Sequence, residues 1–342
     1  MKAAVFTGPN APLSIQDIEK PEIADDEMLV RVSHCGICGT DIHASREGPF
    51  MAPPNTVFGH EFSGEIVEIG GALTDGAFSL GDRITSLPFV KDQTIGLGAI
   101  TGAYAEFVKV DPASVVRIPS ELDDLNGALV EPLAVGLHSV KMAEGVAEKR
   151  VLIIGAGPIG LACAIWCRFF GARKVVISEM SPARIEMANT LGFNDIVDPS
   201  GDVHAQFTAT TAGELDIQFD CVGAPGILQQ CIERAPKRGL IMGIGLCDHP
   251  DSIMPLVAFT KELRVQWAVA YDKEDWDLTI DMMIAGRIDG SPMITNVVSL
   301  DELPDVFEAL RSPTDQCKVI IGDPSMRPAI IMSIVRSQSS LS

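Results

Sequence analysis

A glycine-rich turn between a strand-like and a helix-like segment constrains the fold of this chain most. The run RVLIIG is followed at once by GAGPIG and then by the apolar segment LACAIWC. In a G-x-G-x-x-G pattern, the first glycine permits a tight turn, the second lets the backbone approach a pyrophosphate, and the third allows a helix to pack closely on the strand. The N–H groups at the helix N-terminus attract the phosphates. The residues predicted to bind a dinucleotide here are Gly155, Gly157, Pro158, Ile159 and Gly160.

An acidic residue at the end of the next strand-like run supports this prediction. The run KVVISE ends at Glu179, nineteen residues after Gly160. A carboxylate at this place accepts hydrogen bonds from the ribose hydroxyls of NAD and repels the 2′-phosphate of NADP. Arg184 either packs near the adenine or is a solvated helix residue, and it leaves relaxed use of NADP open. A strand–helix turn that binds no nucleotide is the alternative, since glycines are common in such turns.

The order of the remaining patterns indicates two domains in the 342 residues. Before about residue 110, short β-type runs are separated by Gly and Pro, which is typical of a largely antiparallel, barrel-like β domain. From residue 150 on, strand-like and helix-like runs alternate, which is typical of a doubly wound parallel sheet. The strand-like run KVIIG, residues 318–322, is expected to return to the first domain.

Charge and cysteine content exclude several classes of protein. The chain has 46 acidic and 26 basic residues, a formal net charge of −20, whereas nucleic acids and anionic membranes need clustered Lys and Arg. The N-terminus has no apolar run of a secretory signal, and the uncharged stretch 151–167 is interpreted as strand, turn and helix start. Eight cysteines are too sparse for a disulfide scaffold. We therefore expect a cytoplasmic protein with neither nucleic-acid nor membrane partners.

A second group of residues has the chemistry of a metal site. The segment HCGICGTDIH contains Cys38, Thr40 and His43, the segment GHE contains His60 and Glu61, and Glu131 begins a helical pattern. One thiolate, one imidazole and carboxylates suit Zn²⁺, and a catalytic zinc keeps three protein ligands and one exchangeable position. The C-x-x-C spacing of Cys35 also fits a zinc knuckle or a redox pair, but no second C-x-x-C follows.

Six motifs in order give the chain a family resemblance: CGICGTDIH, GHEFSGEIVEIG, GDRIT, EPLAVGLH, VLIIGAGPIGL and FDCVG. Over residues 1–322 it resembles the zinc-dependent medium-chain dehydrogenase/reductase superfamily of alcohol and polyol dehydrogenases. The resemblance implies an α/β protein with a GroES-like β-barrel catalytic domain and a Rossmann domain with a doubly wound parallel sheet. The implied catalytic domain is 1–137, with 273–342 returning to it, and the implied NAD-binding domain is 138–272.

The resemblance also implies roles for single residues. Cys38, His60 and Glu61 match zinc-binding positions, whereas Cys35 does not bind metal. Glu131 matches a position that is Cys in typical alcohol dehydrogenases and Glu in the sorbitol and polyol branch, where it binds zinc or holds its water. The proton relay corresponds to Thr40 and His43, and Val222 in FDCVG is expected to contact the cofactor. His138 is expected to be a packing or hydrogen-bonding residue.

A departure from the family concerns the loop that often carries four cysteines for a structural zinc. Between Arg83 and Gly102 this chain has no cysteine, so we expect one catalytic zinc per subunit and no structural zinc. Relatives form dimers or tetramers, often through edge strands of the Rossmann sheet, and LRVQWAV is the candidate edge. Trp267, Tyr271 and Trp276 either wall the substrate pocket or belong to the core or an interface.

The implied activity is hydride transfer between a secondary alcohol or polyol and NAD. Zinc would stabilise the alkoxide, and the proton would leave through Thr40 and His43. Two alternatives stay open: a zinc-free quinone or enoyl reductase of the same superfamily, and a nucleotide-binding protein without turnover. The sequence assigns no function to residues 323–342, whose IIMSIV run fits an extra strand or helix and whose Ser-rich end is expected to be disordered.

Overall fold

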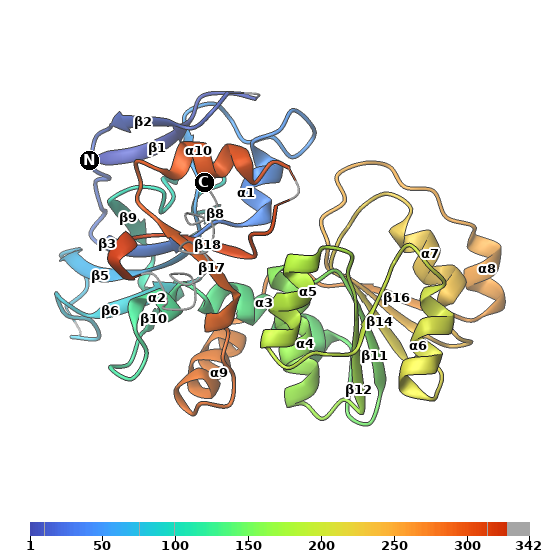
Figure 1. The fold of residues 1–342 in the computed structure, drawn as a ribbon. Helices are drawn as coiled ribbons and strands as arrows, with labels where there is room; N and C mark the ends of the chain where they lie inside the picture. Colours follow the sequence, from blue (N-terminus) through green and yellow to red (C-terminus); the bar gives the residue numbers. More distant parts are fainter. Residues whose placement is uncertain (10, 75, 99, 313, 327–342) are drawn as a thin grey trace, which may run out of the picture. The chain divides into compact units, whose positions relative to one another are not determined.

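The computed structural model describes residues 1–326 apart from residues 10, 75, 99 and 313 (Figure 1). The described chain forms two compact units, of which the first comprises Met1–Glu131 and the described residues from Ile294 onward, and the second comprises Pro132–Met293. The segment 273–293, expected from the sequence to return to the first domain, belongs to the second unit instead. The reason lies in α9 (Lys273–Ile284), where Asp275 bonds to His138 and Lys141 of α3 (Val130–Met142).

The first unit is built on a mostly antiparallel sheet with the strand order β10-β6-β5-β3-β18-β17, and β9 also pairs with β3. Its strands are β3 (Met28–Gly36), β5 (Glu61–Ile69), β6 (Arg83–Ser86), β9 (Phe107–Val110), β10 (Val115–Arg117), β17 (Ile294–Val298) and β18 (Lys318–Ile321). As predicted, the run at 318–321 returns to this unit, where β18 pairs antiparallel with β3 and parallel with β17.

Smaller elements complete the first unit. They are the sheet β2-β1-β4, formed by β1 (Lys2–Phe6), β2 (Ser14–Asp17) and β4 (Thr56–Val57), the hairpin β7 (Phe89–Val90) and β8 (Gln93–Thr94), and the helices α1 (Gly39–Ala44), α2 (Asp124–Gly127) and α10 (Leu303–Ala309). One apolar core joins the strands to α10, where Phe307 stacks on Phe58 with ring centroids 6.1 Å apart. This core holds α1 and β5, which carry the residues of the predicted metal site.

The second unit is the predicted parallel sheet, with the strand order β13-β12-β11-β14-β15-β16. Its strands are β11 (Arg150–Ile154), β12 (Lys174–Ser178), β13 (Ile196–Val197), β14 (Ile217–Asp220), β15 (Leu240–Gly243) and β16 (Arg264–Trp267). The central strand β11 is buried on both faces, which explains its continuous apolar run. As expected, β16 is an edge strand.

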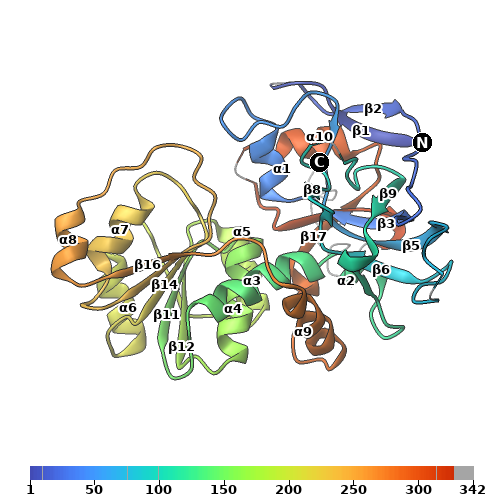
Figure 2. The same ribbon diagram turned by 180° about the vertical axis from the view of Figure 1, so that it is seen from behind.

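Helices cover both faces of this sheet (Figures 1 and 2). They are α4 (Pro158–Phe169), α5 (Pro182–Thr190), α6 (Val203–Thr211), α7 (Ile227–Arg234) and α8 (Pro255–Thr260). The helices α6, α7 and α8 share one apolar cluster with the strands, and α4 packs against the opposite face. The uncharged stretch 151–167 divides into β11, a turn and α4, and no helix among the described residues has the length and hydrophobicity to cross a bilayer.

Trp276 of the predicted aromatic group is fully buried, and its ring contacts Tyr271 with centroids 5.3 Å apart. Trp267 is 63% exposed on the edge strand β16. Trp276 therefore belongs to the core of the second unit. The IIMSIV run and the Ser-rich end of the chain lie outside the described residues.

Candidate active site

The end of β3 and the start of α1 hold the first residues of the site. Cys38 is the N-cap of α1, and its Sγ accepts a hydrogen bond from the backbone N–H of Thr40 at 3.4 Å. The carboxylate of Asp41 accepts the N–H of Cys38 at 3.3 Å, which completes a capping box. This local bonding explains why CGTDIH forms a short helix, because the cap satisfies backbone N–H groups that the helix leaves free. It also fixes the direction of the Cys38 thiol.

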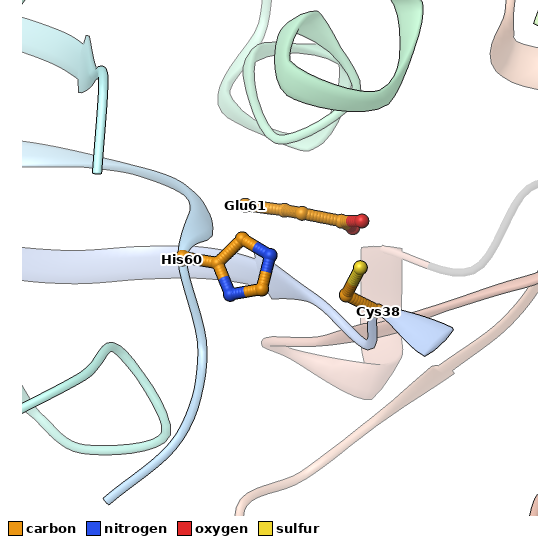
Figure 3. Close-up of side chains that lie close together, drawn as sticks. All are labelled: Cys38, His60 and Glu61. Atoms are coloured by element: carbon orange, nitrogen blue, oxygen red, sulfur yellow. The ribbon is translucent and has the colours of Figure 1, made fainter. Parts of the chain in front are cut away.

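Glu61 is the first residue of β5 and His60 directly precedes it, and they bring two more ligand atoms to the thiol of Cys38. The three candidate ligand atoms all lie within 4.8 Å of one another, and the imidazole and carboxylate point toward the sulfur (Figure 3). His60 and Glu61 are 6% and 1% exposed. A thiol, an imidazole and a carboxylate around one point are the donor set that Zn²⁺ prefers, so these residues fit the metal that the sequence predicts.

The charged groups around the imidazole of His60 show which sign of charge this cluster favours in a bound ion. Burial raises the pKa of the Cys38 thiol, and the carboxylate of Glu61 raises it further. Burial lowers the pKa of His60, but Asp41 and Cys38 outweigh burial, so the pKa of His60 is well above its usual range. The acidic groups around His60 therefore favour a positive charge at this place.

Asp41 connects the imidazole to a second buried side chain. Its Oδ1 lies 3.3 Å from Nδ1 of His60, and its Oδ2 accepts the hydroxyl hydrogen of Tyr104 at 2.7 Å. This contact has the distance of an ion pair but not the geometry of a hydrogen bond. Metal-binding histidines commonly turn their second ring nitrogen toward a carboxylate, which sets the tautomer and the ring orientation. With Nδ1 turned to Asp41, His60 presents Nε2 to Cys38.

Glu61 also forms a buried ion pair with Lys318 of β18. The Nζ of Lys318 donates to both carboxylate oxygens, at 2.8 and 2.7 Å, and to the carbonyl oxygen of Ile37 at 3.2 Å. Burial lowers the pKa of Lys318, but Glu61 outweighs burial, so the pKa is raised above its usual value. The close approach of Glu61 to β3 requires Gly36, because a Cβ there would collide with the carboxylate. Glu61 is therefore a charge-paired carboxylate as well as a candidate ligand.

The other residues predicted for the metal site and its surroundings lie outside the three-ligand cluster. Thr40 and His43 lie three residues apart on α1, so both follow directly after Cys38 on one short helix. Glu131 is 6% exposed near the start of α3, but its carboxylate is not one of the three mutually close ligand atoms. Cys35 is fully buried in β3, and its thiol donates to the carbonyl oxygen of Gly36 at 3.6 Å. His138 is a hydrogen-bonding residue, as predicted, with Nδ1 2.8 Å from Oδ2 of Asp275.

The predicted nucleotide turn lies between β11 and α4, and glycine is suited to each of its three glycine positions for a different reason. Gly155 has φ +92°, a conformation that favours glycine, and a Cβ on Gly160 would collide with the carbonyl oxygen of Gly155. A Cβ on Gly157, the N-cap of α4, would meet no atom within 4 Å. The turn is therefore tight on its inner side and open at Gly157, where a phosphate is expected to approach.

Glu179 lies beside this turn and is 7% exposed. Its Oε2 accepts the N–H of Ala156 at 2.9 Å, and its Oε1 accepts the N–H groups of Met180 and Ser181 at 2.8 Å each. The carboxylate therefore links the glycine turn to the start of α5. A carboxylate has about four lone-pair sites, so at least one remains for a ribose hydroxyl.

The other predicted cofactor residues surround the same turn. Val222 is 46% exposed after β14, and one of its methyl carbons lies 2.8 Å from the position that a Cβ on Gly155 would take. Arg184 is in the first turn of α5, where its N–H donates to Oγ of Ser181 at 3.5 Å. Pro158 and Ile159 form the first turn of α4.

Three residues of the metal site were given no role of their own from the sequence: Asp41, Tyr104 and Lys318. A lysine beside the apolar run VII was a signal, since a buried lysine needs a partner. Asp41 stands within the motif CGTDIH, and Tyr104 is one of only two tyrosines in the chain. None of these signals identifies the partner, because the partners lie far away in the sequence.

Comparison with known proteins gives the class of this site. The profile of the family described as alcohol dehydrogenase GroES-like domain matches residues 24–120, and that of zinc-binding dehydrogenase matches residues 158–285. The chain belongs to the zinc-dependent medium-chain dehydrogenase/reductase superfamily, which confirms the resemblance. It is an oxidoreductase of the alcohol dehydrogenase type, with zinc and a nicotinamide as cofactors.

Individual relatives match over nearly the whole chain. (R,R)-Butanediol dehydrogenase of Bacillus subtilis is 30% identical over 94% of this chain and 99% of its own length, and its crystal structure has a TM-score of 0.84. L-Threonine 3-dehydrogenase of Rhizobium etli is 31% identical over 91% of this chain and 96% of its own. A structure from Sinorhizobium meliloti, described as a zinc-binding dehydrogenase bound to NADP, has a TM-score of 0.83 at 30% identity and covers 94% of this chain and 98% of its own.

Proposed function

We propose that the protein transfers hydride reversibly between a small secondary alcohol or polyol and NAD at one zinc ion per subunit. The observation that supports this most is the cluster of Cys38, His60 and Glu61, whose ligand atoms lie within 4.8 Å of one another. Zinc in such a site supplies Lewis acidity that polarises the substrate oxygen. A zinc-free reductase of the same superfamily has no need of this cluster.

Cys38 and His60 are the proposed permanent ligands, and a carboxylate of Glu61 or Glu131 completes the set. Both oxygens of Glu61 accept hydrogen bonds from Lys318, so a metal ion bound by Glu61 would be repelled by the ammonium group beside it. Glu131 is a buried carboxylate whose charge also raises the pKa of Lys318. We therefore favour Glu131 as the carboxylate that holds the metal or its water, with Glu61 as an exchanging partner.

Thr40 and His43 are the proposed proton path. The hydroxyl of Thr40 follows the ligand Cys38 by two residues, and His43 follows one turn later on α1. In this proposal the hydroxyl of Thr40 accepts the hydroxyl proton of the substrate as it passes its own proton on toward His43, which exchanges a proton with solvent. A histidine suits this role because it both accepts and releases protons near neutral pH.

The cofactor is the proposed ligand of the glycine turn, with its pyrophosphate at Gly157 and the N-terminus of α4. We propose that Glu179 binds the adenine ribose and favours NAD, because its carboxylate repels a 2′-phosphate. Val222 is proposed to line the same site. Arg184 forms no ion pair within the described part of the chain, and it is the residue that would accommodate NADP, the cofactor seen in the Sinorhizobium meliloti structure.

The names of the relatives support a secondary alcohol as substrate. Butanediol dehydrogenase and threonine 3-dehydrogenase are named for compounds that carry a hydroxyl group on a secondary carbon. Glu131, the residue of the sorbitol and polyol branch, supports the same class. We further propose a cytoplasmic homo-oligomer, a dimer or tetramer, that pairs through the edge strand β16, where Trp267 is 63% exposed.

The test is a screen of secondary alcohols, polyols and sugars by NADH absorbance, with zinc quantified in the same preparation. We expect NAD-dependent turnover of at least one secondary alcohol, one zinc per subunit, and loss of both in Cys38→Ser. Turnover of quinones or enoyl compounds by zinc-free protein would identify the rival reductase. Cofactor binding without turnover of any substrate would indicate a nucleotide-binding protein instead.

A further inference from the structure

The side chain of Tyr104 places a hydroxyl group deep inside the first unit, close to the metal-binding residues. Tyr104 is 0% exposed and precedes β9, whereas Asp41, which accepts its hydroxyl hydrogen at 2.7 Å, belongs to α1. Burial raises the pKa of the Tyr104 hydroxyl well above its usual range, and Asp41 raises it further. The hydroxyl therefore stays protonated and donates to the carboxylate. The proton path proposed above does not use it.

The two oxygens of the Asp41 carboxylate have different partners. Oδ2 accepts the Tyr104 hydroxyl at 2.7 Å and the Cys38 N–H at a longer 3.3 Å, whereas Oδ1 faces Nδ1 of His60 at 3.3 Å. The Tyr104 hydrogen bond is the shortest of the three contacts, and it holds Oδ2 away from the imidazole. The orientation of the carboxylate, and with it the nitrogen that His60 turns to Cys38, therefore depends on this hydroxyl.

The ring of Tyr104 has packing contacts that are separate from its hydroxyl. A Cβ on Gly59, the neighbour of His60, would collide with the Tyr104 ring, and the ring of Phe307 lies edge-on with centroids 6.3 Å apart. Phenylalanine keeps these contacts and removes only the hydroxyl. Packing and hydrogen bonding by Tyr104 are therefore separable by one substitution.

We propose that Tyr104 is a positioning residue for the metal, in which its hydroxyl fixes the Asp41 carboxylate and Asp41 in turn orients His60. This inference rests on the metal site proposed above. Without the hydroxyl, Oδ2 keeps only the long hydrogen bond from Cys38, so the carboxylate gains freedom to rotate. His60 then presents Nε2 less consistently, and the metal binds more weakly.

The experiment measures zinc affinity by competition with a chelator in the wild type, in Tyr104→Phe and in Tyr271→Phe. Tyr271 is the matched control, because it is the only other tyrosine, is 8% exposed and lies in the second unit. Removal of an outer partner of a metal-binding histidine costs about 10- to 100-fold in metal affinity, and we expect about 10-fold for Tyr104→Phe. Tyr271→Phe should stay within about twofold of the wild type. Equal affinity in wild type and Tyr104→Phe would overturn the proposal.

A double-mutant cycle with Asp41→Asn tests whether Tyr104 acts through Asp41. If it does, Tyr104→Phe adds no further loss of zinc affinity in the Asp41→Asn background, whereas an additive loss contradicts the proposed chain of contacts. Cobalt(II) substitution gives a second readout, because the absorption bands of cobalt report ligand geometry. We expect the bands to shift in Tyr104→Phe and to stay unchanged in Tyr271→Phe, and unchanged bands in both variants contradict the proposal.

One measurement on the unaltered chain covers the case in which Tyr104→Phe does not fold. Isotope-labelled tyrosine gives two sets of ring signals, because the chain has two tyrosines. We expect zinc to shift the Tyr104 signals in proportion to binding and to leave those of Tyr271 in place, and the opposite pattern refutes the inference. Failure of the wild type to bind zinc, or Cys38→Ser binding it equally well, contradicts the metal site itself and is thereby distinguishable from failure of the Tyr104 proposal.

Discussion

The ion pair between Lys318 and Glu61 gives the strongest prediction for stability. Lys318→Met removes the ammonium group and keeps a side chain of similar length in β18. The side chains of Lys318 and Glu61 are 2% and 1% exposed. The Nζ of Lys318 donates one hydrogen bond to each carboxylate oxygen of Glu61, at 2.8 and 2.7 Å. The substitution therefore leaves a carboxylate without its counter-charge in a site with almost no solvent exposure.

The size of the effect follows from this burial. Removing one partner of a buried ion pair costs about 3–5 kcal/mol, mostly because the remaining charge is uncompensated. We expect Lys318→Met to lower the free energy of unfolding of the first unit by this amount. In Glu61→Met/Lys318→Met no charge is left behind, so at least about half of the loss should be recovered.

The assay has to separate the two units, because a protein of two units need not unfold in one step. All three tryptophans, Trp166, Trp267 and Trp276, lie in the second unit, so tryptophan fluorescence in denaturant follows that unit alone. Hydrogen exchange measured on peptides from β3 and β18 follows the first unit. We expect faster exchange in β3 and β18 of Lys318→Met and an unchanged fluorescence transition.

Two results would refute this reasoning. A loss of less than about 1 kcal/mol in Lys318→Met would mean that Glu61 is solvated or protonated in the folded protein at little cost. A double variant as unstable as Lys318→Met would mean that the lysine stabilises by packing and by its bond to the Ile37 carbonyl rather than by charge. Zinc must be removed from all variants first, since bound metal would itself compensate Glu61.

Three further predictions concern single residues. Cys38→Ser should lose bound zinc and turnover together, as measured by metal analysis and NADH formation, and full activity after chelation in the wild type contradicts a catalytic metal. Glu179→Ala should raise the KM for NAD about 10- to 100-fold, the equivalent of losing a hydrogen bond to a charged group, with little change in kcat; an unchanged KM in steady-state kinetics argues against its ribose role. His34 is 5% exposed, burial lowers its pKa below 6.5, and its ring nitrogens have no hydrogen-bond partner among the described residues. The unfolded chain therefore binds the proton more tightly, so the free energy of unfolding should fall as the pH drops below about 6.5. In His34→Leu, the free energy of unfolding from denaturant titrations should depend less on pH in this range, and an equal pH dependence in both proteins excludes this role.

Most of the fold was predictable because its signals are local. A buried parallel strand such as β11 has a continuous apolar run, and the glycine turn after it has a conformational reason at Gly155 and a steric reason at Gly160. The return of β18 was visible as an apolar run after the last helical pattern. The boundary near residue 273 was not predictable in this way, because nothing in the local pattern of α9 reports that Asp275 bonds to His138 and Lys141.

In the metal site, too, the residues that stand in local motifs were predictable and those that depend on distant contacts were not. Cys38, His60 and Glu61 were predicted because their residue types stand in short motifs, and the structure brings them together. Lys318 lies 257 positions from its partner Glu61, and Tyr104 lies 63 positions from Asp41. Neither residue type is unusual at a strand or loop position, so only the fold reveals the contact. Outer contacts of a site are therefore harder to predict from sequence than its ligands.

The place of β18 between β3 and β17 also has a consequence for the synthesis of the protein. The ribosome completes the entire second unit before it makes β17 and β18, and roughly 190 residues separate the end of the first segment from the end of β18. At about 5–20 residues per second, this takes on the order of 10–40 s. During that time the edge of β3 that β18 later covers stays open. We therefore expect the nucleotide-binding unit to fold first and the metal site to form only after synthesis has reached Lys318.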